Sequence, residues 1–172
     1  GSSVGAGNLH GGFVVGKETV NESAWKSLYR AEGEGIDGRA LEKLGVFAYD
    51  KEAARFTQEV YHKADEALLA AARSVRDVYT KGRVTEGIIG TADSWNCQVD
   101  QVLFLHDFYG SAVEEMEGDA VAQICQTYDI PFLTIRVVSN TVFAGDVDWD
   151  LAVGAALQEY VLAVAEAYMR SR

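Results

Sequence analysis

The stretch AVEEMEGDAVAQICQTYDIPFLTIRVVSN, residues 112–140, decides the fold class because a predicted amphipathic helix leads directly into a predicted strand. Three carboxylates and a methionine stand at the expected start of the helix, which we expect to run to about Tyr128. After Pro131 comes an apolar run that only Thr134 and Arg136 interrupt, the strongest strand signal in the chain. Such a strand is typical of an α/β protein whose sheet is covered on both faces.

The same alternation of strands and helices continues through the rest of the chain. The sequence therefore predicts one α/β domain over residues 1–172, a three-layer mixed sheet flanked by helices. A glycine-rich loop opens the chain, and it leads into a β-branched stretch. The expected elements are strands over 13–20, 87–92 and 129–140, a short helix around 38–44, and helices over 63–82, 98–110, 112–128 and 148–170.

Composition limits the kinds of partner. The chain has 172 residues and a net charge of −11, and this negative potential disfavours binding to nucleic acid or to an anionic membrane surface. No apolar run approaches the roughly 18 residues that a membrane span needs. Cys97 and Cys125 match no metal-ligand spacing and are expected to be free thiols, which slightly favours the cytoplasm. The three histidines also lack metal-ligand spacing, so no metal site is expected.

Ligands of open α/β sheets bind beyond the carboxyl ends of the strands. That rule points to residues 1–12, 92–97 and 139–148 as segments that follow or precede strands, with the acidic helix start as a fourth candidate. All four carry glycines, aromatic residues or polar side chains. We expect them to converge on one site.

The acidic helix start has two interpretations. An ionised carboxylate such as that of Glu117 can accept hydrogen bonds from two neighbouring hydroxyls, which is the geometry of a ribose diol. Met116 would offer a soft apolar surface to the sugar, and Glu115 stands beside it. The alternative is that glutamates occur in the first turn of a helix only because they suit its dipole.

Two strand ends also allow a functional and a structural interpretation. Trp95 follows the strand over 87–92 and offers a flat surface on which a purine can stack, with Asn96 next to it. The alternative is a tryptophan of the core or of an interface. Ser139 and Asn140 end the strongest strand, where a side chain can donate to a leaving base, although Asn140 can equally cap a turn.

Three segments resemble, in chain order, the nucleoside phosphorylase/nucleosidase superfamily, and above all the methylthioadenosine/S-adenosylhomocysteine nucleosidases. They are VVGKETV after the glycine-rich opening, EGIIGTADSWN, and EEMEGDAVAQICQTYDIPFLTIRVVSN. The resemblance covers most of residues 85–140. It implies a phosphorylase/hydrolase-like fold, a purine nucleoside as substrate and a homo-oligomer. It implies no cofactor, with inorganic phosphate as co-substrate in the case of a phosphorylase.

The resemblance also implies roles for individual residues. Glu117 would accept the ribose diol, with Met116 packed on the sugar and Glu115 beside it. Trp95 would stack on the purine. Asn96 would lie where backbone groups contact the edge of the base. Ser2 or Ser3 would lie near the ribosyl carbon and the attacking water or phosphate.

The chain departs from the family pattern in ways that leave its activity open. Asn140 stands where the nucleosidases have an aspartic acid that protonates the purine, and an amide cannot supply that proton. Glu114 replaces an apolar residue and Asp119 an alanine. Relative to the family the chain is also expected to be N-terminally incomplete, without the glutamate that activates water.

Two functions from different classes therefore stand side by side. The first is an enzyme that cleaves the N-glycosidic bond of a purine nucleoside such as methylthioadenosine or S-adenosylhomocysteine, by hydrolysis or phosphorolysis. The second is a catalytically degenerate member that binds or stores nucleosides or purines. The sequence leaves open the nucleoside, its 5′ substituent and the oligomeric state.

Overall fold

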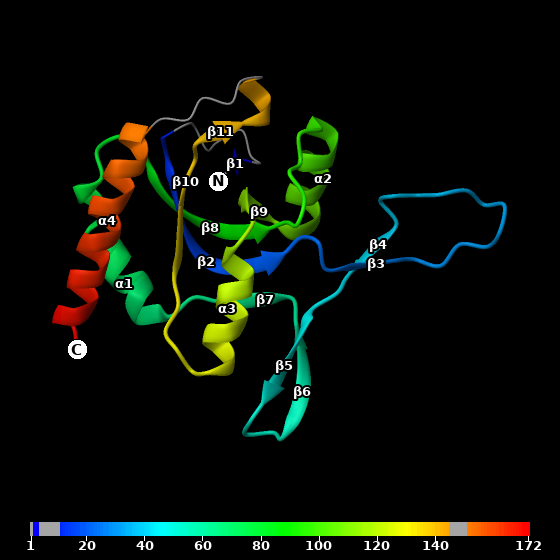
Figure 1. The fold of residues 1–172 in the computed structure, drawn as a ribbon, viewed down its shortest axis with the longest axis horizontal. Helices are drawn as coiled ribbons and strands as arrows, with labels where there is room; N and C mark the ends of the chain where they lie inside the picture. Colours follow the sequence, from blue (N-terminus) through cyan, green and yellow to red (C-terminus); the bar gives the residue numbers. More distant parts are fainter. Residues whose placement is uncertain (1, 4–10, 145–150) are drawn as a thin grey trace.

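The computed structural model describes residues 2–3, 11–144 and 151–172, and its centre is a mixed sheet (Figure 1). The strand order is β10-β2-β8-β9-β1-β11, and β7 also pairs with β2. The strands of this sheet are β1 (Ser2–Ser3), β2 (Phe13–Asn21), β7 (Tyr61–Lys63), β8 (Val84–Thr91), β9 (Ser111–Glu115), β10 (Thr134–Val137) and β11 (Asn140–Thr141). Strands β2, β8 and β9 are parallel neighbours, so their carboxyl ends lie along the same edge of the sheet.

The helices follow the strands as the alternating pattern predicts. They are α1 (Glu66–Ser74), the 3₁₀ turn η1 (Arg76–Val78), α2 (Val99–Tyr109), α3 (Gly118–Thr127), the 3₁₀ turn η2 (Val142–Ala144) and α4 (Leu151–Arg170). Two hairpins, β3 (Trp25–Ser27) with β4 (Leu41–Lys43) and β5 (Val46–Asp50) with β6 (Arg55–Glu59), extend away from the sheet (Figure 1). Among the helices in the described ranges, none has the length and apolar character that crossing a bilayer requires.

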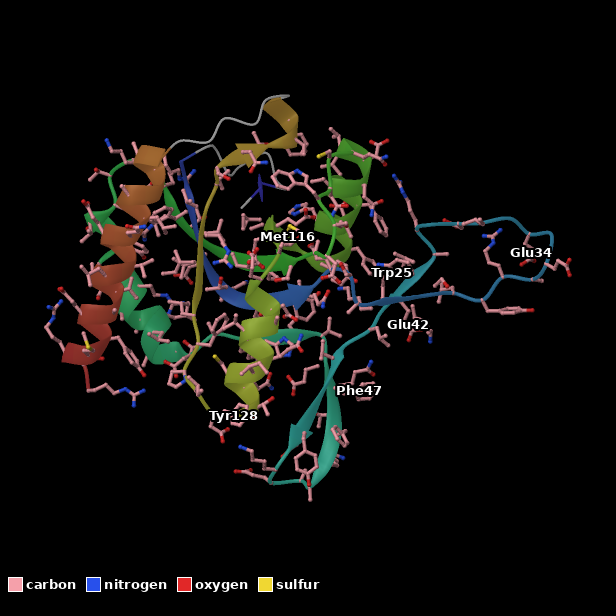
Figure 2. All side chains as sticks on the ribbon, viewed as in Figure 1. Trp25, Glu34, Glu42, Phe47, Met116 and Tyr128 are labelled. Carbon is pink, nitrogen blue, oxygen red and sulfur yellow. The ribbon has the colours of Figure 1, made fainter. Side chains whose placement is uncertain are left out.

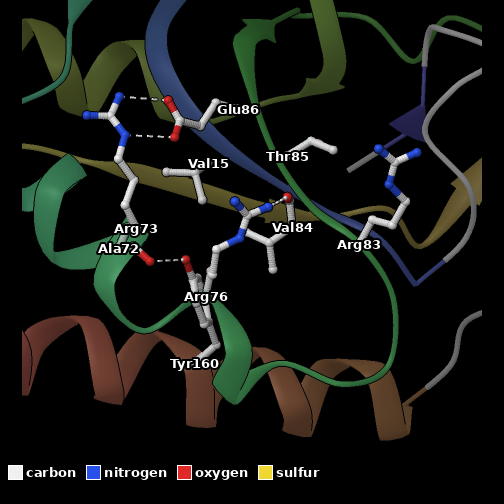
Figure 3. Close-up of a pocket in the computed structure, with 9 residues that line it drawn as sticks. All are labelled: Val15, Ala72, Arg73, Arg76, Arg83, Val84, Thr85, Glu86 and Tyr160. Atoms are coloured by element: carbon white, nitrogen blue, oxygen red, sulfur yellow. Dashed lines mark hydrogen bonds and ion pairs between the residues drawn. The ribbon is translucent and has the colours of Figure 1, made fainter.

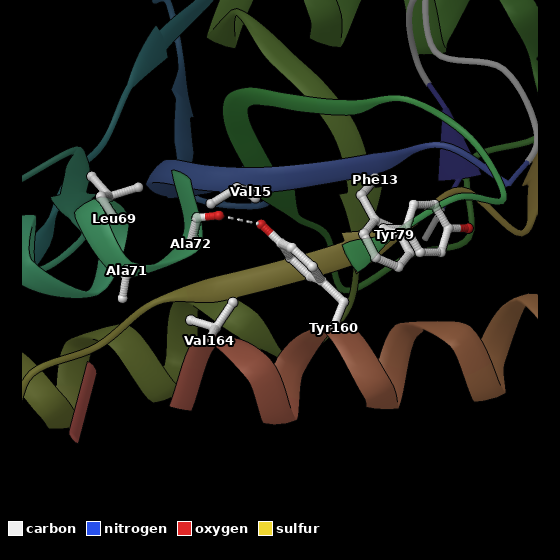
Figure 4. Close-up of a cluster of buried hydrophobic side chains, with 8 residues drawn as sticks. All are labelled: Phe13, Val15, Leu69, Ala71, Ala72, Tyr79, Tyr160 and Val164. Carbon is white, nitrogen blue, oxygen red and sulfur yellow. Dashed lines mark hydrogen bonds between the residues drawn. The ribbon is translucent and has the colours of Figure 1, made fainter. Parts of the chain in front are cut away.

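Helices α1 and α4 pack together on one face of the sheet (Figure 4). Phe13 of β2 stacks on Tyr79 with 3.7 Å between ring centroids, and Val15 lies in the same buried cluster. Tyr160 of α4 is fully buried, and its hydroxyl donates to the Ala72 carbonyl at 2.9 Å. Because the polar tip of Tyr160 has a partner, the ring can fill the space between helix and sheet without leaving an unpaired group.

Helix α3 lies on the opposite face. Val14 points away from Phe13 and Val15 and belongs to a different buried cluster, which also contains Ile89 of β8. Thr91 lies two residues after Ile89, hence on the same face, and its hydroxyl accepts from the backbone N–H of Asp119 in α3 at 2.9 Å. Helices on both faces confirm the predicted three-layer architecture.

The strands over 13–20 and 87–92 are confirmed as β2 and β8, and the helices over 63–82 and 98–110 are present as α1 with η1 and as α2. The predicted short helix around 38–44 is wrong. Residues Leu41–Lys43 instead form β4, which pairs with β3, and Lys26 and Glu42 form an ion pair of 2.7 Å across the hairpin. Cross-strand pairing outweighs the weak local helix preference of this segment.

The predicted helix start in the acidic segment is also wrong. Residues Ser111–Glu115 form the central strand β9 between β8 and β1, and α3 begins only at Gly118. Glu114 and Glu115 are buried there because other parts of the chain supply hydrogen-bond partners for them, which a local pattern does not reveal.

The two hairpins carry exposed aromatic side chains, among them Trp25 on β3 and Phe47 on β5 (Figure 2). Tyr29 and Ile36 in the loop between β3 and β4 are also exposed. The expected homo-oligomer stays a prediction.

Candidate functional site

The candidate site lies at the edge of the sheet where the parallel strands β8 and β9 end. Gly90 pairs with Glu114 and Thr91 with Glu115, so residues 92–97 and 116–117 leave the sheet side by side. On the other side of β9, Ser2 pairs with Glu114 and also with Asn140 of β11. Described residues from all four segments that the sequence predicted to converge therefore lie at one edge of the sheet.

Glu115 is a buried anchor at this edge, with 6% of its surface exposed. Both of its oxygens accept from the Gly118 N–H at 2.8 Å, and Oε2 also accepts from Arg136 Nε at 3.0 Å. The Thr91 hydroxyl and Arg136 Nη2 donate to it as well. Burial alone raises the pKa of Glu115, but the hydrogen bonds from Thr91, Arg136 and Gly118 outweigh burial and hold this pKa below its ordinary value.

These contacts give Glu115 a structural task, because its acceptor positions are already used within the protein. The Glu117 N–H also donates to Glu115 Oε2 at 3.1 Å, so the buried carboxylate fixes the turn from β9 into α3. The carboxylate thereby satisfies backbone donors that the start of a helix otherwise leaves without partners.

Met116 and Glu117 form the exposed part of that turn. Met116 lies where the chain leaves β9 for α3 (Figure 2). Glu117 is the residue that precedes the first turn of α3, and its side chain is 73% exposed. Its Oε2 lies 3.9 Å from Arg136 Nη2, which keeps a cation near the carboxylate. Glu117 is thus an open acceptor on a rigid support.

Glu114 points to the opposite face from Glu115, because successive side chains of a strand alternate. It is 8% exposed, and its Oε2 accepts from Asn96 Nδ2 at 2.7 Å. This bond ties the loop after β8 to the end of β9. Trp95, the residue before Asn96, is 55% exposed and offers its ring to solvent.

Asn140 is buried at the start of β11, and the Ser139 hydroxyl donates to its Oδ1 at 3.0 Å. Since the amide oxygen accepts this bond, the amide NH₂ is the donor group that the side chain has for a further hydrogen bond. The register described above places Asn140 one strand away from Ser2 and two strands away from Glu114.

The structure thus brings Asn96, Glu115, Met116, Glu117 and Asn140 to one edge, with Trp95 and Ser139 beside them in the chain. Ser2 and Ser3 are described only as backbone of β1. The rest of the glycine-rich loop, residues 4–10, and the acidic residues Asp146, Asp148 and Asp150 lie outside the described residues.

Two polar groups near this edge are buried in a way that sequence reasoning did not predict. Asp119 is fully buried, and its Oδ1 accepts from His62 Nδ1 at 2.9 Å and from the Thr19 hydroxyl at 3.2 Å. Burial raises the pKa of Asp119, but the bonds from His62, Gln123 and Thr19 outweigh burial and lower it. The sequence did contain a signal for Asp119, because an aspartate stands there in place of the family's alanine. The second group is Glu22, which has no distinguishing sequence pattern.

A cavity of about 310 Å³ lies elsewhere, on the face that α1 and α4 cover (Figure 3). Arg73, Arg76 and Arg83 line it. Arg73 donates to both oxygens of Glu86 at 2.8 Å, and Arg76 donates to the Val84 carbonyl at 3.2 Å, so much of this positive charge is used within the protein. Across the described ranges, no group of three or more His, Cys, Asp or Glu side chains is placed to hold a metal ion.

These features define an α/β protein with a polar and aromatic site at the carboxyl edge of a mixed sheet. Residues 3–170 match the family model described as the phosphorylase superfamily, and the chain belongs to that family. The family to which the sequence motifs pointed is therefore confirmed.

Relatives agree with this assignment, and solved structures agree with the fold. The chain is 40% identical over 79 residues to a 5′-methylthioadenosine/S-adenosylhomocysteine nucleosidase of Bacillus cereus strain B4264, which covers 45% of this chain and 34% of that protein. An S-adenosylhomocysteine nucleosidase from Streptococcus pyogenes, solved with 5-methylthiotubericidin, superposes with a TM-score of 0.63 at 20% identity, over 96% of this chain and 64% of that one. A nucleosidase from Colwellia psychrerythraea in complex with adenine gives 0.66 at 20% identity, over 97% and 64%.

The chain thus spans about a third of the curated relative and about two thirds of the solved structures. At these identities the structures show the fold. The sequence similarity to a nucleosidase lies in the 79 residues that are 40% identical to the Bacillus cereus protein.

The anchoring role of Glu115 leads to a stability prediction. Arg136→Met leaves a buried carboxylate without its cation, and because the Arg136 side chain is itself 28% exposed we expect the free energy of unfolding at pH 7 to fall by about 3 kcal/mol, the low end for a broken buried pair. Urea unfolding measures this. In wild type the contribution of Glu115 to the free energy of unfolding is present at pH values above the ordinary pKa of a glutamate, and it disappears as the pH falls through the lowered pKa of Glu115. In the variant this contribution disappears at a higher pH.

The control is Arg73→Met, which breaks the exposed pair with Glu86 and should change stability far less. Equal losses in the two variants would show that Glu115 does not depend on Arg136.

Proposed function

We propose that this chain carries the nucleoside site of a purine nucleosidase that cleaves the N-glycosidic bond of a substrate such as methylthioadenosine or S-adenosylhomocysteine. The observation that carries the proposal is the convergence of Asn96, Glu117 and Asn140 on the edge formed by β8, β9, β1 and β11. The similarity to nucleosidases described above supports the substrate class.

Glu117 binds the ribose in this proposal. Its carboxylate is exposed, and its two oxygens can accept from the 2′- and 3′-hydroxyls together. The turn beneath it is held by the Glu115 network, so little conformational entropy is lost when the sugar binds. Met116 packs its thioether against the sugar ring.

Trp95 and Asn96 bind the base. The exposed indole ring is available for stacking on a purine, whose flat face matches it. The bond from Asn96 to Glu114 fixes the loop that carries both residues, so the ring and the backbone groups beside it are presented in one arrangement. Stacking and edge contacts together select a purine.

Asn140 stabilises the leaving base. As the bond between the ribosyl carbon and the purine nitrogen breaks, its electron pair passes to the purine, and the sugar acquires oxocarbenium character. The Asn140 NH₂ donates a hydrogen bond to the purine as negative charge develops on it, which lowers the barrier without transferring a proton. Water then bonds to the ribosyl carbon and loses a proton, while the departing base takes one from solvent.

The test of the proposal is the release of free base. The protein is incubated with methylthioadenosine and with inosine, with and without inorganic phosphate, and free purine is measured by chromatography. We expect release from methylthioadenosine without phosphate. Release only with phosphate would mean that phosphate, and not water, is the nucleophile and that the reaction is a phosphorolysis. Saturable purine binding with no release would favour the binding or storage alternative.

Asn140→Asp gives a sharper prediction. The buried position favours the protonated form of a carboxylic acid, which can then protonate the leaving purine. We expect turnover of adenine nucleosides to rise at least about tenfold, since general acid catalysis contributes factors of this size or more. The rate should also fall as the pH rises and the new acid ionises. Steady-state kinetics from pH 5 to 9 measures both effects.

The companion variant Asn140→Ala removes the donor without adding an acid and should lower the rate. If Asn140→Asp turns over no faster than wild type, Asn140 does not face the base.

A further inference from the structure

Glu22 is the most deeply buried glutamate of the described residues, with 2% of its surface exposed. It follows directly after β2, and its N–H donates to the Thr91 carbonyl at 2.7 Å, which continues the pairing with β8. Neither of its carboxyl oxygens accepts a hydrogen bond of normal geometry from the described residues. A buried ionised carboxylate without donors is costly, so this environment favours the neutral acid.

The backbone of β8 makes room for this side chain at Gly90. A Cβ atom at position 90 would lie 2.3 Å from the carboxyl carbon of Glu22, so a side chain there would displace the Glu22 carboxyl group from its present position. Gly90 pairs in register with Glu114 on the next strand. Glu22 therefore lies over Gly90, on the face to which Glu114 points, and the two carboxyl groups are close enough to affect each other's pKa.

Two carboxyl groups side by side form a hydrogen bond only if one of them carries the proton. The partners of Glu114 decide which one does. Burial raises the pKa of Glu114, but the bond that it accepts from Asn96 Nδ2 opposes burial and favours its ionised form, whereas neither oxygen of Glu22 accepts a bond of this kind. The proton therefore belongs on Glu22.

The other groups around Glu22 agree with this assignment. On β9 the charges of Glu114 and Glu115 disfavour a second anion, while the Ser111 hydroxyl favours one. From α2, Tyr109 lies close enough that burial and then the charge of Glu22 raise its pKa, and Lys43 Nζ of β4 lies 5.6 Å from the centroid of the Tyr109 ring. Burial, the largest effect, raises the pKa of Glu22 to about 8.

We propose that Glu22 is a positioning residue for base binding: its protonated carboxyl group donates to the Glu114 carboxylate, which in turn holds Asn96 and the loop of Trp95 in place. The inference rests on the proposed function in that the loop it holds is the proposed purine site. When Glu22 loses its proton, two carboxylates face each other in a buried space. Their repulsion displaces Glu114 and weakens its bond to Asn96.

The pH dependence follows from the direction of the shift. Glu22 has a raised pKa in the folded protein. Its contribution to the free energy of unfolding is therefore complete at pH values below the ordinary pKa of a glutamate, and it is lost as the pH rises to about 8. Purine binding should weaken over the upper part of that range.

The first measurement needs no turnover and no ligand. The side-chain amide signals of Asn96, assigned with Asn96→Ala, are followed by NMR from pH 6 to 9. We expect wild type to show a change with a midpoint near pH 8, Glu22→Gln to show none, and the exposed-glutamate control Glu52→Gln to behave as wild type does. A flat titration in wild type, or an unchanged one in Glu22→Gln, overturns the inference.

The second measurement is the affinity for free adenine over the same pH range. Wild-type affinity should fall about tenfold from pH 6.5 to 9, as expected when one ionisation controls binding, and Glu22→Gln should keep the same affinity throughout. Glu114→Gln removes the negative charge beside Glu22, which lowers the pKa of Glu22. The midpoint of the pH dependence of adenine affinity should therefore move to a lower pH in this variant. This variant is the test if Glu22→Gln does not fold.

The two proposals fail in different ways. If base release is absent but the Asn96 signals titrate as expected, the coupling of Glu22 to Asn96 stands and the proposed enzyme activity does not. If base is released but the pH dependence survives in Glu22→Gln, the activity stands and the role of Glu22 does not.

Discussion

The buried carboxylate of Glu115 is the interaction on which the rest of the candidate site depends. Its partners come from three separate elements: Thr91 from β8, Arg136 from β10 and the Gly118 N–H from α3. A charge in this position is tolerable only because all of these donors are present. The same contacts fix where β9 stops and α3 begins, and this turn presents Met116 and Glu117 to solvent on a rigid support.

The alternation of side chains along β9 divides two consecutive acids between two tasks. Glu115 faces α3 and is held ionised by its donors, whereas Glu114 faces Gly90 and Asn96 on the other side of the sheet. One acid therefore supports the proposed sugar site and the other the proposed base site. A shift of one residue in the register of β9 would exchange the two faces and remove both supports.

Sequence reasoning succeeded where apolar residues are continuous or periodic over a whole element. The runs in β2 and β8 and the stripe of α1 need no information from distant residues, since burial follows from the local pattern. Reasoning failed at residues 111–115, because acids belong in a central strand only when distant donors neutralise them. It also failed at Leu41–Lys43, where pairing with β3 decides the conformation.

The site was predictable in part for the same reason. The rule that ligands bind at the carboxyl ends of strands and the family motif both pointed to Trp95, Asn96, Glu117 and Asn140. Neither pointed to Glu22, because its burial depends on a glycine in another strand and on the partners of Glu114.

The central claim is that the turn held by Glu115 presents Glu117 to the sugar of a purine nucleoside. The most direct test compares the dissociation constants of 5-methylthiotubericidin, the ligand named for the Streptococcus pyogenes relative, and of free adenine, in wild type and in Glu117→Ala. The account predicts that the variant binds the nucleoside analogue at least about tenfold more weakly, as the loss of hydrogen bonds to a charged group implies, while adenine binding is unchanged. Equal losses for the two ligands would contradict it.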